Sequence, residues 1–140
     1  MALKETDNFQ DGGITTSIVP WLSVPNGTQA VDFYKSAFGA TEVYHLDTPD
    51  GGVVARLSIK GAEFWLSAEP PKDDVASVQI SHDIPVRMIF TVADPDTIFN
   101  QALKAGASEI FAVGEGHGWR LGRLVDPFGH HWEIGHPLAS

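Results

Sequence analysis

The sequence predicts an α+β domain made of two βαβββ modules, whose two curved four-stranded mixed sheets surround a cleft. Two observations lead to this fold. Residues 19–69 and 87–135 repeat the same order of helix caps, glycines and apolar segments. In each half, one amphipathic helix follows a short strand and precedes three further strands. Because neither module alone can cover both faces of its sheet, the two modules are expected to pair.

Length and composition indicate one globular domain, since 140 residues with 43% hydrophobic side chains can bury a core without disulfides. No apolar run reaches the roughly 20 residues of a membrane-spanning helix, and no signal segment opens the chain. Cysteine is absent, which excludes thiolate chemistry and fits a cytoplasmic location. The net charge of −9 would repel phosphate backbones and anionic lipids, so neither nucleic acid nor a membrane is an expected partner.

The first module is predicted over residues 17–69, after a flexible N-terminal segment of residues 1–16. Asn26 ends the first strand and is a residue type that caps helices well. A helix is expected over residues 27–38, because apolar side chains recur on one stripe, and Gly39 is suited to end it. The remaining strands of this module are expected over residues 40–46, 53–60 and 62–68.

The second module repeats this plan over residues 86–137, after a linker of residues 70–85 that is rich in proline and aspartate. Asp94 is the expected helix cap, and Pro95 fits the first helical turn, where its missing N–H costs nothing. The strands after this helix are expected over residues 108–113, 118–126 and 130–135.

The chain ends in a motif that combines a turn with a polar strand face: Asp126-Pro127-Phe128-Gly129-His130-His131-Trp132-Glu133. Strand alternation directs Trp132 to the packed face, and His131 and Glu133 to the opposite one. Together with the helix segment of residues 30–40, this motif resembles the vicinal-oxygen-chelate superfamily, and within it the PhnB-like branch of the glyoxalase, bleomycin-resistance and dioxygenase proteins. The likeness covers residues 17–137. It implies the glyoxalase/bleomycin-resistance fold and a homodimer, with clefts built within one chain or from halves of both chains.

The resemblance also implies where a metal would bind. In metal-using members of the superfamily, four ligands come from the first and last strands of each half. Carried to this chain, those positions are Val19, Trp65, Arg87 and Glu133. Only Glu133 has a side chain that coordinates a cation, because Arg87 is a permanent cation and the other two lack a suitable donor. One carboxylate does not make a divalent metal site, so no cofactor is expected.

Two other arrangements are open for Glu133. One is a displaced metal site of Glu63, His131 and Glu133, an imidazole with two carboxylates. In the other, Arg87 pairs with Glu133 where the metal would otherwise lie, and either neutralises the carboxylate or holds a ligand anion. If the protein is an enzyme, Glu133 is the best candidate for a catalytic group, as a metal ligand or a general base.

The leading functional hypothesis is a metal-independent protein that binds or sequesters a small aromatic or amphiphilic molecule in its cleft. Tryptophan rings would supply flat contacts, and charged groups would supply a polar end. The alternatives are a metal-dependent lyase, isomerase or dioxygenase, and a structural or regulatory dimer with a filled cavity. The predicted ligand-binding residues are Trp21, Trp65, Arg87, Trp119, His131 and Glu133.

Overall fold

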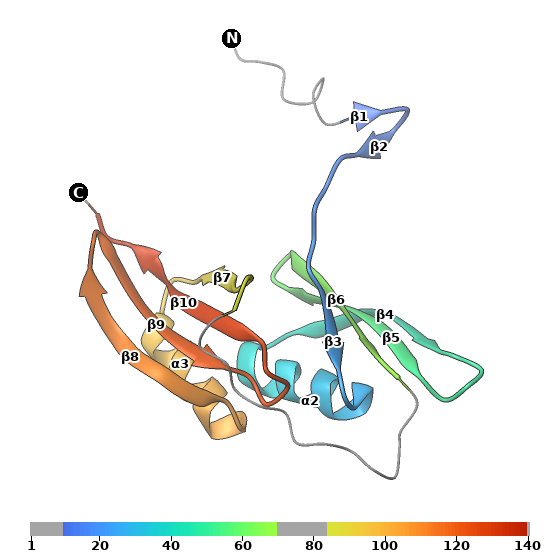
Figure 1. The fold of residues 1–140 in the computed structure, drawn as a ribbon. Coiled ribbons are helices and arrows are strands. Elements are labelled where there is room, and N and C mark those ends of the chain that lie inside the picture. The colour runs from blue at the N-terminus through green and yellow to red at the C-terminus, as the bar shows by residue number, and fades with distance from the viewer. Residues whose placement is uncertain (1–9, 70–83, 140) are drawn as a thin grey trace.

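The computed structural model of the protein describes residues 10–69 and 84–139 (Figure 1). Most of the predicted linker of residues 70–85 therefore lies outside the described residues, as do residues 1–9 of the predicted N-terminal segment. The rest of that segment contains a small antiparallel hairpin that the sequence did not predict, β1 (Gln10–Asp11) with β2 (Ile14–Thr15). In Figure 1 this hairpin stands away from the two large sheets, at the end of an extended stretch.

The first module forms a four-stranded mixed sheet in the order β3-β6-β5-β4, with only the β3–β6 pair parallel. Its elements follow the predicted βαβββ order closely. They are β3 (Trp21–Val24), α2 (Gly27–Phe38), β4 (Thr41–Asp47), β5 (Val53–Ile59) and β6 (Ala62–Ala68).

The second module repeats this topology in the order β7-β10-β9-β8, with β7 and β10 parallel. Its elements are β7 (Met88–Thr91), α3 (Pro95–Ala105), β8 (Ser108–Gly116), β9 (Trp119–Val125) and β10 (His131–Pro137). The predicted duplication and fold class are thus confirmed. Strand β8 is longer than predicted, because Gly114 and Gly116 continue to pair with β9 although their residue type is typical of a turn.

Side-chain caps start both helices at the predicted residues. The Asn26 side chain accepts a hydrogen bond from the backbone N–H of Gln29 at 2.9 Å, and Asp94 accepts one from that of Thr97 at 3.2 Å. Gly39 ends α2 with a φ of 72°, a left-handed conformation that glycine adopts without steric cost. Neither helix is long and apolar enough to cross a membrane, within the residues the structure describes.

One hydrophobic core joins the two modules. Helices α2 and α3 pack against each other, and each also contacts one face of its own sheet. The prediction that Trp132 packs in the core is confirmed, since the ring is 3% exposed and lies 4.7 Å from Phe38 and 5.5 Å from Phe64, centroid to centroid. Both helices contact the covered faces of their sheets. They lie together against the shared core, and the other face of each sheet is open (Figure 1).

A buried carboxylate ties this core to the loop before β10. Asp126 is 3% exposed, and its Oδ2 accepts hydrogen bonds from the Tyr34 hydroxyl at 2.5 Å and from Trp132 Nε1 at 3.0 Å. Its Oδ1 accepts two more from the backbone N–H groups of Phe128 and His130, at 3.0 and 2.9 Å. Burial and the nearby Asp126 carboxylate raise the pKa of Tyr34 well above its ordinary value, so the hydroxyl keeps its proton and remains a donor.

We expect Asp126→Ala to lower the free energy of unfolding by at least about 3 kcal/mol, because four donors lose their acceptor in the core. Tyr34→Phe keeps the ring and removes one donor, and should cost about 1–2 kcal/mol. Urea unfolding followed by far-ultraviolet circular dichroism measures both changes. Tyr44→Phe, on a ring that is 45% exposed, is the matched control and should change little. Equal stability losses in the two tyrosine variants would contradict the role given to Asp126.

Candidate functional site

The open face of the first sheet carries a row of four side chains in direct cross-strand register. Tyr44 of β4 lies opposite Arg56 of β5, Arg56 opposite Trp65 of β6, and Trp65 beside Trp21 of β3. Alternation explains why these residues share a face while their neighbours Leu57, Phe64 and Leu66 pack against the helix. We call Tyr44, Arg56, Trp65 and Trp21 the aromatic row.

Side chains of the aromatic row contact one another across the strands. The rings of Trp21 and Trp65 are stacked, with centroids 5.5 Å apart and planes 6° apart. Tyr44 lies 5.6 Å from Trp65, and the Arg56 guanidinium lies 5.5 Å from the same ring in cation–π geometry. Trp21 is nevertheless 56% exposed. The row is therefore an aromatic surface whose side chains are held by contacts with one another. Its open side is available to a ligand or to another protein surface.

The second sheet has the equivalent row at the equivalent register. Phe111 of β8 lies opposite Arg123 of β9, Arg123 opposite Glu133 of β10, and Glu133 beside Ile89 of β7. We call Phe111, Arg123, Glu133 and Ile89 the charged row. Glu133 thus occupies the position that Trp65 holds in the first sheet, as the sequence duplication predicts.

Arg87, immediately before β7, pairs with Glu133 in the charged row. Its Nε lies 2.5 Å from Glu133 Oε2, and the side chains are 48% and 15% exposed, respectively. This is the ion pair hypothesised from the sequence. Because the carboxylate is the more buried partner, the guanidinium compensates a charge that the fold has largely removed from water. Arg87 also lines a cavity of about 460 Å³ that Val19 borders from the first module.

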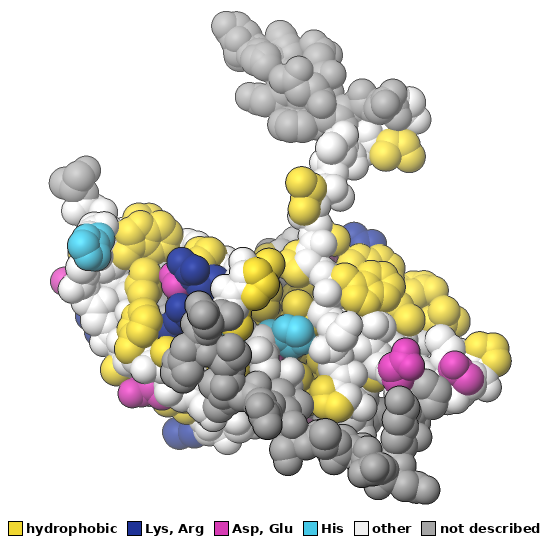
Figure 2. Space-filling model, in the orientation of Figure 1, with side chains coloured by type: hydrophobic (Ala, Val, Ile, Leu, Met, Phe, Trp, Pro, Cys, Tyr) yellow, Lys and Arg dark blue, Asp and Glu magenta, His cyan; other side chains and the backbone are white. Residues whose placement is uncertain are grey.

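A second cavity, of about 280 Å³, lies next to the charged row. It is lined by Ile89, Trp119, Leu121, Glu133 and Gly135. Gly135 has a steric reason to be glycine, since a Cβ there would lie 2.3 Å from the Arg120 carbonyl oxygen and 2.5 Å from Leu121 Cβ. In Figure 2, basic side chains lie beside a stripe of hydrophobic side chains on this sheet. The cavity therefore has apolar walls with a charged edge, which suits an amphiphilic ligand.

His131, one of the predicted ligand-binding residues, lies in the interior of the second module. It is 1% exposed and sits opposite Val125, itself fully buried. Alternation does put it on the same face as Glu133, but this end of the sheet is covered. Burial, which strand periodicity cannot reveal, separates His131 from the groups that solvent reaches.

The displaced metal site is not assembled in one chain. Glu63 lies on the first sheet, where it forms an ion pair with Arg56, whereas Glu133 is paired with Arg87 on the second. Among residues 10–69 and 84–139, no three side chains of histidine, aspartate and glutamate are placed to hold a metal ion.

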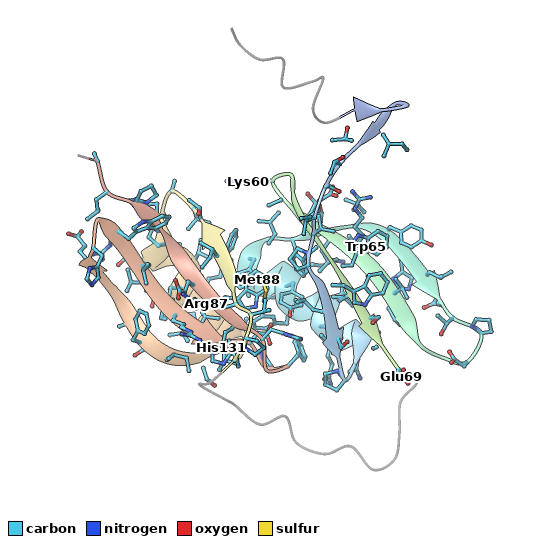
Figure 3. All side chains as sticks on the ribbon, turned by 45° about the horizontal axis from the view of Figure 1, so that its top comes forward. Lys60, Trp65, Glu69, Arg87, Met88 and His131 are labelled. Carbon is cyan, nitrogen blue, oxygen red and sulfur yellow. The ribbon has the colours of Figure 1, made fainter. Side chains whose placement is uncertain are left out.

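The predicted site residues thus fall into two sets in one chain. Trp21 and Trp65 belong to the first sheet, and Arg87, Trp119 and Glu133 to the second. Figure 3 shows this separation through the labelled Trp65 and Arg87, and the cavity beside Glu133 is not lined by either Trp21 or Trp65.

Sequence reasoning missed five members of the two rows: Tyr44, Arg56, Ile89, Phe111 and Arg123. The repeat offered a signal for them, because Arg56-Leu57 and Arg123-Leu124 are matched dipeptides in the two halves.

Comparison with known proteins gives the same fold. A family model described as a glyoxalase-like domain matches residues 21–135. An uncharacterized protein of Mycobacterium bovis is 35% identical over 133 residues, which cover 91% of this chain and 87% of the relative. An uncharacterized protein of Mycobacterium tuberculosis is also 35% identical, with 91% of this chain and 78% of the relative covered.

Solved structures of low sequence identity share the architecture. A glyoxylase/bleomycin resistance protein/dioxygenase domain from Frankia has a TM-score of 0.70 at 15% identity, with 89% of this chain and 98% of that chain covered. TioX from Micromonospora has a TM-score of 0.65 at 21% identity, covering 88% and 99%. A PhnB protein from Bacillus cereus has a TM-score of 0.63 at 20% identity, covering 89% and 100%.

The contribution of the Arg87–Glu133 ion pair to the free energy of unfolding can be measured with a double-mutant cycle of Arg87→Met and Glu133→Gln. Arg87→Met leaves a largely buried carboxylate without its cation, so the two substitutions should be non-additive, with a coupling of about 1 kcal/mol in the free energy of unfolding. Chemical denaturation of the four proteins gives this coupling. Arg87→Met combined with Glu42→Gln, on the first sheet, is the control and should be additive. Additivity in the first cycle would show that the pair contributes nothing to folding.

Proposed function

The chain belongs to the glyoxalase-like domain family of the vicinal-oxygen-chelate superfamily, and on this basis we propose that it binds or sequesters a small aromatic or amphiphilic molecule without a metal. The observation that carries the proposal is the stacked pair Trp21–Trp65, in which Trp21 is 56% exposed and Trp65 is half-buried. A folded protein gains little by leaving so much of a tryptophan side chain in water, whereas a flat ligand would bury it. Trp21 is already held by stacking on Trp65 and by the hydrogen bond that its Nε1 donates to Ser67 Oγ at 2.8 Å, so little conformational entropy is lost on binding.

The state of Glu133 supports metal independence. Its Oε2 is engaged by Arg87 at 2.5 Å, so the only carboxylate at a family ligand position is already charge-compensated. A protein of the same fold has been crystallised with a metal: a mutant of the FosX fosfomycin resistance protein from Listeria monocytogenes in complex with Mn(II), with a TM-score of 0.65 at 14% identity. The alternative function, which metal analysis of the protein tests, is accordingly that of a metal-dependent lyase, isomerase or dioxygenase.

The partner that best completes the site is a second copy of the chain. Both open faces hold large exposed side chains, with Trp21 and Ile89 each 56% and Phe111 44% exposed. In a twofold-symmetric dimer, the aromatic row of one protomer faces the charged row of the other, and symmetry forms the cleft twice. Such a cleft unites the two sets of site residues that lie on different sheets of one chain. The absence of cysteine fits a cytoplasmic protein.

We expect N-phenylnaphthylamine, a neutral aromatic probe, to bind saturably with enhanced fluorescence. Trp65→Ala should weaken this binding about tenfold, because it removes the ring on which Trp21, Tyr44 and Arg56 converge. Ile14→Ala, which truncates an exposed apolar side chain on the separate hairpin, is the control and should leave binding unchanged.

Metal analysis of the purified protein accompanies this titration. Probe binding should be the same before and after treatment with a chelator. Stoichiometric zinc or manganese, together with loss of binding on chelation, would overturn metal-independent binding and favour the metal-dependent alternative. Unsaturable probe fluorescence, unaltered by Trp65→Ala, would leave the aromatic row without a binding role.

The dimer is tested by sedimentation equilibrium, which should give twice the 15.1 kDa mass of one chain. Ile89→Glu adds a second carboxylate next to Glu133 on the open face and should shift the protein to monomer. Ile14→Glu adds the same charge on the hairpin and should leave the dimer intact. A wild-type protein that sediments as a monomer would contradict the composite cleft.

A further inference from the structure

We propose that Arg123 binds an acidic group of the ligand, so that the ligand is an aromatic or amphiphilic molecule bearing a carboxylate or sulfonate. This rests on the proposed binding function and specifies the charge of the molecule bound. Arg123 lies at the centre of the charged row, between Phe111 and Glu133. It was not among the residues predicted from the sequence.

Arg123 has no partner among the residues that the structure describes. No hydrogen bond or ion pair with residues 10–69 or 84–139 engages its guanidinium, and its Nε atom is buried with no acceptor among them. A partly buried cation of this kind has lost hydration without gaining a counter-charge. An anionic ligand group would supply both the missing acceptor and the missing charge, in bidentate geometry if it is a carboxylate.

The duplicated module provides an internal comparison. Arg56 occupies the equivalent position in the first sheet, and its Nε is likewise buried without an acceptor. The rest of its guanidinium is engaged, however, by an ion pair with Glu63 and by the face of Trp65. The cross-strand neighbour of Arg123 on β10 is Glu133, whereas that of Arg56 on β6 is Trp65. Within the described residues, no glutamate forms an ion pair with Arg123. Within the described residues, the Arg56 guanidinium therefore has an ion-pair partner, and that of Arg123 has none.

The neighbouring carboxylate leaves this charge uncompensated. Glu133 is the direct cross-strand neighbour of Arg123, but its Oε2 is held by Arg87 at 2.5 Å. Two guanidinium groups thus lie near one carboxylate that pairs with only one of them, which leaves one excess positive charge at this point of a chain whose net charge is −9. In a protein that otherwise repels anions, such a local excess favours an anion at this one site.

The surroundings of Arg123 define the rest of the ligand. Leu121 lies two residues before Arg123 on the same face of β9, and it lines the 280 Å³ cavity together with Ile89 and Trp119. Phe111 is the cross-strand neighbour on the other side and is 44% exposed. An acidic group on Arg123 would place an attached ring or chain against these apolar side chains.

Two fluorescent probes with the same aromatic body separate charge recognition from apolar contact. Anilinonaphthalene sulfonate carries an anionic group, and N-phenylnaphthylamine lacks it. Arg123→Gln should lower the affinity for the sulfonate probe about tenfold, because a charge-assisted hydrogen bond is lost. The neutral probe should bind the variant as it binds the wild type, which also shows that the variant has folded. Arg123→Lys keeps the charge and should retain part of the sulfonate affinity.

Arg120→Gln is the matched control. It removes the same formal charge from the adjacent part of β9, but Arg120 is paired with Asp96 of α3 at 2.6 Å. Sulfonate affinity should therefore be unchanged in this variant. Equal losses of sulfonate-probe affinity in Arg120→Gln and Arg123→Gln would show that the effect comes from the change in net charge, and would overturn the proposal. Equal affinity of the wild type and Arg123→Gln for the sulfonate probe would also overturn the proposal for Arg123. If the neutral probe still binds in that case, the proposed binding function is not contradicted. Failure of both probes to bind the wild type would instead reject the proposed function.

Discussion

The arrangement of both modules depends on the buried carboxylate of Asp126. Its two oxygens accept four hydrogen bonds, from the Tyr34 hydroxyl, the Trp132 indole and two backbone N–H groups of the loop before β10. Tyr34 belongs to the first module and Trp132 to the second, so one side chain fixes the contact between them. It also fixes the start of β10, and hence the positions of Glu133 and its row. A buried carboxylate is tolerated here because every donor around it is used.

This packing explains why the site residues lie on two open surfaces. With α2 and α3 packed together on the shared core, each sheet has one covered and one uncovered face. The uncovered faces carry equivalent rows that have diverged in chemistry. The first carries an aromatic surface centred on Trp65. The second carries an ion pair and a guanidinium that has no partner in the part of the chain that the structure describes. The proposed dimer brings these two faces together from different chains.

Most of the fold could be predicted from the sequence because local signals were consistent with one another. The caps Asn26 and Asp94 fix both helix starts, and alternation correctly separates Trp132 from Glu133. The repeat then gives the topology. The Arg87–Glu133 pair could be hypothesised because the duplication aligns Arg87 with a ligand position.

Other features depend on contacts between distant segments, which periodicity does not encode. The sequence predicts a turn at Asp126 but not the convergence of Tyr34 and Trp132 upon it. It assigns His131 to the face of Glu133 but cannot reveal that this end of the sheet is buried. The packing of the two helices together, and with it the separation of the site into two surfaces, likewise follows from tertiary contacts alone.

The proposed composite site takes its aromatic row from one chain and its charged row from another. Mixed dimers of a Trp65→Ala chain and an Arg123→Gln chain, co-expressed with different affinity tags, test it most directly. In a composite arrangement, one cleft of the mixed dimer receives both defects and the other receives neither. Titration with anilinonaphthalene sulfonate should then recover wild-type affinity in half of the sites. If the mixed dimer shows only the weakened affinities of its two parents, the site lies within one chain and the account is wrong.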